Sequence, residues 1–177
     1  MIFKPAGISG AFTINPRISS DERGVFIKEH DAKVFKENGL HSNIEQLNLS
    51  QNNSKGIIRG MHFQTEPFAE AKVMRCIKGE IFFVIVDMRK NSNTFLKWEG
   101  FHLSEENKIT VYAPEMCATG YQALTDGAEA LYSSSNIYAP KQEMGIRYDD
   151  PKVGIAWPIT ENISVSEKDK GWEFIKI

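Results

Sequence analysis

The hydrophobic positions of this chain fall into short runs that are separated by glycine, proline and asparagine. Runs of four to eight apolar and β-branched residues between turn residues are typical of buried strands. The strongest run occupies residues 81–86. Further strands are predicted at 11–14 (as an edge strand), 25–27, 44–50, 95–103, 109–113, 117–124 and 128–134. One helix is predicted at 31–38, with Asp31 as its cap and Gly39 just beyond its end. Many short strands and one helix predict an all-β sandwich or barrel.

One stretch, residues 54–89, interleaves polar side chains with strand residues. These polar side chains are Arg59, His62, Gln64 and Lys72. Lysine and arginine are almost never fully buried unless they are paired, so a plain core does not need them here. His62 and Gln64 share one face of a strand, and Gly60 permits a break in alternation that would bring Arg59 to the same side. The stretch therefore predicts the floor of a pocket.

The residue types in this predicted pocket indicate proton transfer. A lone histidine on an apolar strand is more often a satisfied core or surface residue, but Lys72 can reach the same cavity as His62. Histidine moves protons near neutral pH, and a lysine ammonium stabilises an oxyanion where water is scarce. The residue two positions after His62 is Gln64, and the other histidines show no ligand spacing, so no metal is predicted. The chain has no GxSxG motif, and neither cysteine has a basic neighbour in sequence, which disfavours nucleophilic catalysis.

Composition narrows the function classes further. A length of 177 residues suits a single domain, 1–177. The net charge of -2 and the absence of a basic run argue against a nucleic-acid partner. Cys76 and Cys117 have no CxxC spacing, and two buried free thiols in a reducing compartment are expected. No run reaches membrane-span length, and Pro5 interrupts the N-terminal apolar residues, so a cytoplasmic protein without a membrane partner is predicted.

A series of short motifs runs from about residue 14 to residue 169. It includes DERG at 21–24, QxNxS at 46–50, RGMHFQ at 59–64, Lys72, the block 114–121, Tyr132, YAP at 138–140 and VSEKD at 165–169. In order and spacing these motifs resemble the dTDP-4-dehydrorhamnose 3,5-epimerase family. The resemblance implies a cupin jelly roll and an isomerase that needs no cofactor. It also implies a nucleoside-diphosphate 4-keto-6-deoxy sugar as substrate, a role in deoxysugar and lipopolysaccharide biosynthesis, and a homodimer formed through the N-terminal region. Phe12 and Ile14 are candidate contacts of that dimer.

The resemblance also implies roles for single residues. His62 matches the general base, Asp169 its carboxylate partner, Tyr132 the acid, and Lys72 the cation that stabilises the enolate. The substrate-binding positions that it implies are Arg23 and Arg59 for the diphosphate, Tyr138 for stacking on the base, and Gln46, Asn48, Thr119, Glu143 and Lys168. Taken singly, the two tyrosines would be ordinary strand aromatics, and the charged residues near the C-terminus would be solvated.

The chemistry of a 4-keto sugar fits the roles implied for these four residues, His62, Asp169, Tyr132 and Lys72. The protons at C3 and C5 are both alpha to the carbonyl, so removal of either one leaves an enolate. Inversion then needs a base on one side, an acid on the other and a cation at the enolate oxygen. Two alternatives stay open, a 3,4-ketoisomerase on the same substrates and a non-catalytic cupin that binds a sugar nucleotide. The nucleoside and the inverted centre also stay open.

Two positions depart from the family pattern. Thr119 stands where the family has a pocket histidine, and Lys28 stands where it has a glutamate. The departures leave the proton-transfer residues intact and bear on the substrate. They predict that dTDP-4-keto-6-deoxyglucose is a poor substrate or is inverted at one centre only, because the pose of the sugar controls which proton faces the base.

Overall fold

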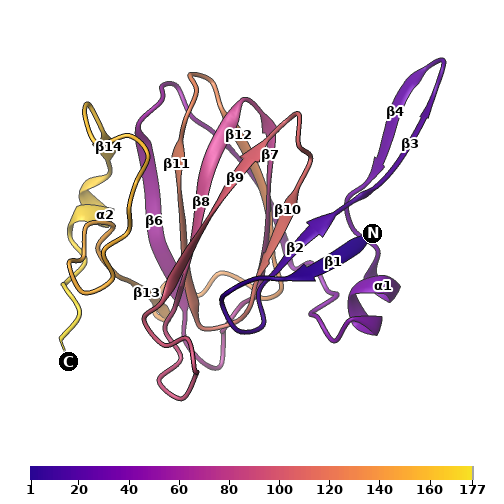
Figure 1. Cartoon of the computed structure of the whole chain (residues 1–177). Coiled ribbons are helices and arrows are strands. Elements are labelled where there is room, and N and C mark those ends of the chain that lie inside the picture. The colour runs from indigo at the N-terminus through magenta and orange to yellow at the C-terminus, as the bar shows by residue number, and fades with distance from the viewer. Residues whose placement is uncertain (177) are drawn as a thin grey trace.

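The computed structural model describes residues 1–176, which form two antiparallel sheets that face each other (Figure 1). In spatial order the first sheet contains β1 (Ile2–Pro5), β2 (Phe12–Asn15), β10 (Thr110–Ala113), β7 (Lys72–Lys78), β12 (Glu129–Ser134) and β5 (Gln46–Gln51). The second contains β13 (Glu143–Gly145), β6 (Ile57–Gln64), β11 (Cys117–Ala123), β8 (Glu80–Asp87) and β9 (Trp98–Ser104), and the short β14 (Ser164–Val165) runs parallel to β6. The predicted all-β class is confirmed, and the architecture is a jelly roll.

Strand β8 carries the strongest hydrophobic run because both of its faces are buried. Phe83 and Ile85 point into the main core between the two sheets. Phe82 and Val84 point the other way, into a second cluster that the C-terminal segment covers with Trp157 and other apolar residues. A strand that is buried on both faces has no polar side to alternate with, which explains the unbroken sequence pattern.

The predicted helix is confirmed as α1 (Ala32–Glu37). The Asp31 side chain accepts a hydrogen bond from the Val34 amide, as an N-cap residue does, and Phe35 is the buried residue of the helix. Gly39 has a φ of 73° just after the helix, the left-handed conformation that glycine adopts without strain. A second helix, α2 (Glu167–Lys170), is capped by Ser166. Within residues 1–176 no helix is long and apolar enough to cross a membrane.

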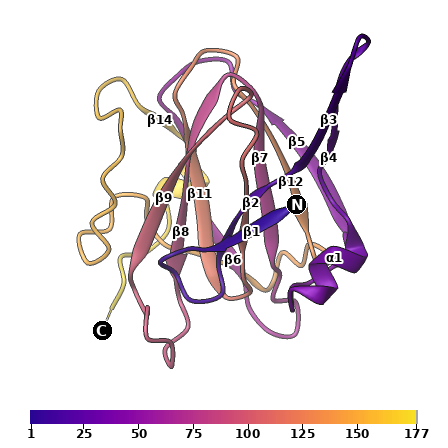
Figure 2. The same cartoon turned by 45° about the vertical axis from the view of Figure 1, so that its right-hand side comes forward.

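The N-terminal region differs from the prediction in two ways. The strand predicted at the sheet edge, β2, instead pairs with β1, which is the edge strand. β1 has only four residues and ends at Pro5, so its apolar pattern was too short to predict a strand. Residues 19–24, which read as a polar turn, belong mostly to the hairpin of β3 (Arg17–Asp21) and β4 (Gly24–Lys28). This hairpin extends away from the body of the barrel (Figures 1 and 2). A strand that projects into solvent has no buried face, so period-two patterning could not reveal β3.

Candidate active site

A bulge in β6 turns the central motif toward the space between the sheets. His62 lies opposite Thr119 and Arg59 opposite Tyr121, so β6 contains one more residue than β11 over this span. Gly60 sits in the bulge with a φ of 119°, and a Cβ there would lie 2.7 Å from the Cα of Gly120. Only glycine fits such a close approach of two backbones. The predicted break in alternation is confirmed, since Arg59 and His62 line the same cavity.

The cavity consists of two adjoining hollows of about 530 Å³ and about 260 Å³. His62, Lys72 and Tyr132 line both hollows and so stand where the two meet. The larger hollow is also lined by Ser50, Arg59, Met74, Thr119, Lys168 and Asp169, and the smaller by Gln46, Asn48, Gln64, Glu70, Tyr138 and Glu143. The prediction that the central stretch forms the floor of a pocket is confirmed.

A short hydrogen bond joins His62 to Asp169, with 2.6 Å between Nε2 and Oδ1. The Gly60 amide donates to the other carboxylate oxygen at 3.1 Å. Burial by itself would raise the pKa of Asp169, but the His62 bond and charge and the Gly60 amide together lower it. Nε2–H donates its hydrogen bond to the carboxylate, so Nδ1 of the neutral imidazole is the atom that can accept a proton.

We expect Asp169 to stabilise the fold in a pH-dependent way. Its folded pKa is lower than the ordinary 3.8, so its stabilisation is complete above that value and is lost as pH falls through the folded pKa. Asp169→Asn should therefore lower the free energy of unfolding at about pH 6 by more than at about pH 3. Urea unfolding of both proteins at the two pH values measures this. An equal difference at both would contradict the assignment, with the exposed Asp126→Asn variant as the control.

Lys72 and Tyr132 face the cavity from the opposite sheet. Lys72 begins β7 and lies opposite Ser134 of β12, and Tyr132 lies two residues before Ser134, opposite Met74. The Lys72 ammonium pairs with the carboxylate of Glu70 at 3.0 Å. Burial, followed by the charges of neighbouring groups, raises the pKa of Tyr132. A phenol with a raised pKa holds its proton at neutral pH, as a general acid must before it donates.

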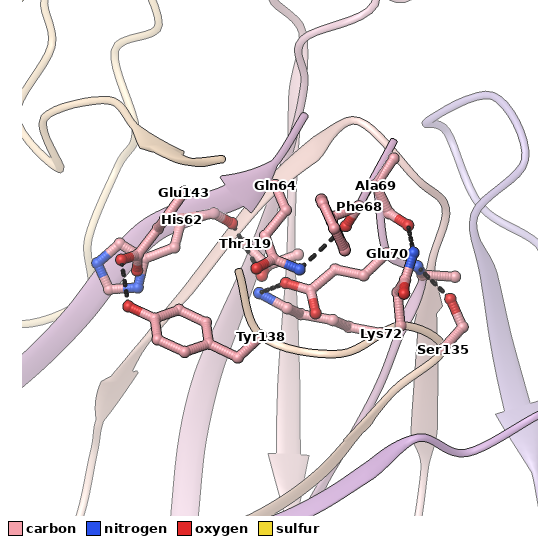
Figure 3. A network of polar contacts seen from close by, with 12 residues as sticks. His62, Gln64, Phe68, Ala69, Glu70, Lys72, Thr119, Ser135, Tyr138 and Glu143 are labelled. Atoms are coloured by element: carbon pink, nitrogen blue, oxygen red, sulfur yellow. Dashed lines mark hydrogen bonds and ion pairs between the residues drawn. The ribbon is translucent and has the colours of Figure 1, made fainter. Parts of the chain in front are cut away.

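Three further residues form one cluster, in which Tyr138 and Glu143 line the smaller hollow and Lys168 lines the larger one. The Tyr138 hydroxyl donates a hydrogen bond to Glu143 at 2.7 Å, and the Lys168 ammonium lies 2.7 Å from both oxygens of the same carboxylate. Burial opposes ionisation of Glu143, but these two partners outweigh it and lower its pKa. Figure 3 shows Tyr138 and Glu143 together beside His62. The side chain of Tyr138 is half exposed, as a stacking platform would be.

The other predicted binding residues fall into two groups. Gln46 and Asn48 project from β5 into the smaller hollow, and Thr119 lies beside His62 in the larger one, where its hydroxyl donates to the His62 carbonyl at 3.4 Å. Arg59 is held by Asn52, whose side-chain oxygen accepts from Nε at 3.0 Å. Arg23 lies elsewhere, at the tip of the projecting hairpin, where its side chain is 84% exposed and pairs with Asp21. One chain alone does not bring Arg23 to the cavity.

Sequence reasoning missed Glu70, although a signal was present. Glu70 is a carboxylate only two positions before Lys72, and both side chains line the smaller hollow. Both cysteines are free and buried, as expected, and burial raises their pKa values to about 11 for Cys76 and about 12 for Cys117. Neither thiol is suited to act as a nucleophile. Among residues 1–176 no group of three or more His, Cys, Asp or Glu side chains is placed to hold a metal ion.

The fold and the cavity define a jelly-roll protein in which a histidine–aspartate pair, a tyrosine and a lysine surround one pocket. The family model for dTDP-4-dehydrorhamnose 3,5-epimerase matches residues 5–176. A dTDP-4-dehydrorhamnose 3,5-epimerase from Methanothermobacter thermautotrophicus is 40% identical over 173 residues, which cover 97% of this chain and 92% of that protein. The chain belongs to the dTDP-4-dehydrorhamnose 3,5-epimerase family, and the recognition from sequence is confirmed.

Two crystal structures share this fold closely. One is a dTDP-6-deoxy-D-glucose-3,5-epimerase from Legionella pneumophila in complex with dTDP-4-keto-L-rhamnose, with a TM-score of 0.92 and 34% identity over 98% of this chain and 92% of that one. The other is a 3'-monoepimerase from Streptomyces bikiniensis in complex with dTDP-quinovose, with a TM-score of 0.87 and 32% identity over 96% of this chain and 86% of that one. Both a double and a single epimerase are therefore similar to this chain, and the predicted cupin jelly roll is confirmed.

Proposed function

We propose that this protein is an epimerase that inverts C3, C5 or both in a nucleotide-linked 4-keto-6-deoxy sugar, without a cofactor. The observation that carries the proposal is one cavity that has His62 of β6 with its partner Asp169 of α2 on one side, and Lys72 and Tyr132 of the other sheet facing them. A protein that only binds sugar nucleotides needs no acid opposite a base. Membership of the family supports the same reaction and substrate class.

The proposed reaction transfers protons in two steps. Nδ1 of His62 removes the proton from a carbon alpha to the ketone, and the electrons of the C–H bond move to the carbonyl oxygen. The Lys72 ammonium stabilises the resulting enolate. The Tyr132 hydroxyl then delivers a proton to the opposite face of the same carbon, which inverts it. Solvent returns a proton to the tyrosinate and takes one from the imidazolium, so the enzyme regains its starting state.

We propose that the remaining cavity residues bind the nucleotide and the sugar. Arg59 suits the diphosphate, because its planar guanidinium can donate two parallel hydrogen bonds to phosphate oxygens. Tyr138 suits stacking on the base, and Glu143 and Lys168 beside it add hydrogen-bonding groups at the rim. Gln46 and Asn48 offer amides to hydroxyl groups from the other sheet.

The number of inverted centres depends on the cavity wall, where Thr119 is the main departure from the family pattern. Thr119 lies directly beside His62 in the larger hollow, which supports an effect on the pose of the sugar. Lys28 lies outside both hollows and pairs with Asp31 at 3.0 Å. Of the two departures, only Thr119 is placed to affect the pose of the sugar. We propose that dTDP-4-keto-6-deoxyglucose is inverted slowly or at one centre only.

Proton exchange tests the function directly. The protein is mixed with dTDP-, CDP-, GDP- and UDP-linked 4-keto-6-deoxy sugars in deuterated water, and deuterium at C3 and C5 is followed separately by NMR. We expect exchange at one or both carbons, unchanged by EDTA, and an inverted 4-keto product after reductive trapping. A product with its ketone at C3 would instead identify a ketoisomerase. Failure of all four sugars to exchange would overturn the proposed function, and rapid double inversion with Thr119 intact would overturn the one-centre proposal.

We propose that the protein is a cytoplasmic homodimer. The projecting hairpin exposes Ile18, Val25 and Phe26, and Leu47 and Leu49 are exposed on β5, the last strand of its sheet. An unpaired strand edge beside apolar residues is a site for strand addition from another chain. The hairpin of a second copy at this edge would carry Arg23 toward the cavity, since the inner face of β5 holds Gln46 and Asn48. The two buried free thiols suit a reducing compartment.

The dimer proposal predicts a linked loss of assembly and activity. We expect wild type to have the mass of a dimer by light scattering at micromolar concentration. Phe26→Asp should produce monomers and reduce epimerisation, because the change buries a charge in the contact. Ile14, a contact proposed from the sequence, is fully buried within one chain and packs with Phe35, so it is not available. A wild-type monomer would contradict the proposal.

A further inference from the structure

The cavity contains an ion pair, Glu70 with Lys72, to whose carboxylate the proposed function assigns no role. The Glu70 carboxylate lies 3.0 Å from the Lys72 ammonium, and the two side chains are only 7% and 14% exposed (Figure 3). Glu70 lines the smaller hollow, and Lys72 lines both. The carboxylate therefore holds the ammonium on the wall of the reaction cavity and not at the protein surface.

The backbone on either side of Glu70 is fixed by hydrogen bonds to the opposite loop. The Ala71 amide donates to the Ser135 hydroxyl at 2.9 Å, and the Ser135 amide donates to the Ala71 carbonyl at 3.0 Å. The Asn136 side chain donates to the Ala69 carbonyl at 3.2 Å. Glu70 is thus presented from a rigid segment, so its carboxylate can define where a flexible lysine side chain stops.

Stability alone does not account for this pair. Removal of two ions from water costs free energy that one contact repays only in part, and apolar replacements of buried pairs are often neutral or stabilising. Within residues 1–176 Lys72 is the ion-pair partner of Glu70, and no second cation joins them. A lysine side chain has four rotatable bonds, so ordering its ammonium at an enolate oxygen costs conformational entropy. A fixed partner lowers that cost because it already restricts the side chain.

We propose that Glu70 is a positioning residue that holds the Lys72 ammonium where the two hollows meet. In the free protein the carboxylate selects one lysine conformation. When the enolate forms, the ammonium is already within the cavity and does not have to be ordered at that moment. The inference rests on the proposed function, in which Lys72 stabilises the enolate.

Three variants test the inference. Glu70→Met removes both charge and acceptor at similar volume, and Glu70→Gln keeps an acceptor oxygen. Glu129→Met is the matched control, because Glu129 pairs with Lys78 at 3.6 Å on the neighbouring strands but lines neither hollow. We expect kcat to fall at least about tenfold in Glu70→Met and less in Glu70→Gln, with KM changed by less than about threefold. Glu129→Met should leave both constants unchanged.

Two further readouts separate positioning from a structural role. Glu70→Met leaves the mostly buried Lys72 ammonium without its partner, so its thermal midpoint should fall. The constants are therefore measured well below that midpoint, where circular dichroism shows the variant to be fully folded. A purely structural role would then leave kcat unchanged, whereas positioning lowers it. In a crystal structure of Glu70→Met the Lys72 ammonium should be displaced by more than about 1 Å or be disordered. Wild-type kcat in Glu70→Met, or an unmoved ammonium, overturns the inference. Absence of exchange by wild type on every sugar would overturn the proposed function instead, and the crystal structure would still decide the position of Lys72.

Discussion

In His62→Asn we expect deuterium incorporation into the 4-keto sugar to fall by at least about a hundredfold, the lower end for loss of general base catalysis. Asparagine preserves much of the shape of the ring and can still meet Asp169, but it cannot accept a proton near neutral pH. NMR detection of exchange at C3 and C5 measures the effect, with bound nucleotide followed separately by calorimetry. Affinity for the nucleotide should change little, because the imidazole reacts with the sugar.

His102→Asn is the matched control for this variant. His102 lies on β9, where it packs on the outer side of Phe82 and lines neither hollow. The control should keep wild-type exchange. Exchange at the wild-type rate in His62→Asn would remove the proposed base and with it the mechanism.

In Tyr132→Phe we expect inverted product to fall by at least about a hundredfold, while deuterium exchange falls less. The variant retains His62 and Lys72, so the alpha proton can still be removed and the enolate can still form. Without the phenol, the proton returns mainly from the side of the base, which exchanges hydrogen but restores the original configuration. The ratio of exchange to inversion, from NMR and reductive trapping, reports the missing acid.

Tyr148→Phe is the control here, because Tyr148 lies outside both hollows. It should keep the wild-type ratio of exchange to inversion. An unchanged ratio in Tyr132→Phe, with both rates reduced equally, would mean that the hydroxyl acts in enolate formation and not as the acid on the opposite face.

The sequence predicted the barrel strands because their burial is local and regular. The unbroken run of β8 and the capped helix α1 both carry signals within about ten residues. Gly60 also indicated the bulge, since a glycine between two polar strand residues is typical of a break in strand pairing. By contrast, β3 and β1 have few buried residues, so their pairing depends on the rest of the fold and leaves little trace in composition.

The site could be predicted only where chemistry and motif order coincided. His62 and Lys72 stood out as polar residues among strand residues, and Asp169 came solely from the resemblance, because 107 positions separate it from His62. Glu70 carried no motif and was overlooked, although it is a carboxylate only two positions before Lys72. Arg23 is a motif residue that the single chain does not bring to the cavity, because the hairpin that carries it projects into solvent.

The position of Asp169 in the chain has a consequence for biosynthesis. It lies in α2, after every strand of both sheets in the order of translation. The strands from β1 to β13 are therefore synthesised before the residue that we propose as the partner of His62, and only the short β14 lies close to it in the chain. We expect a chain truncated after residue 163 to keep a β-rich circular dichroism spectrum while its exchange activity is lost. Loss of the spectrum as well would show that the last segment is needed to build the barrel.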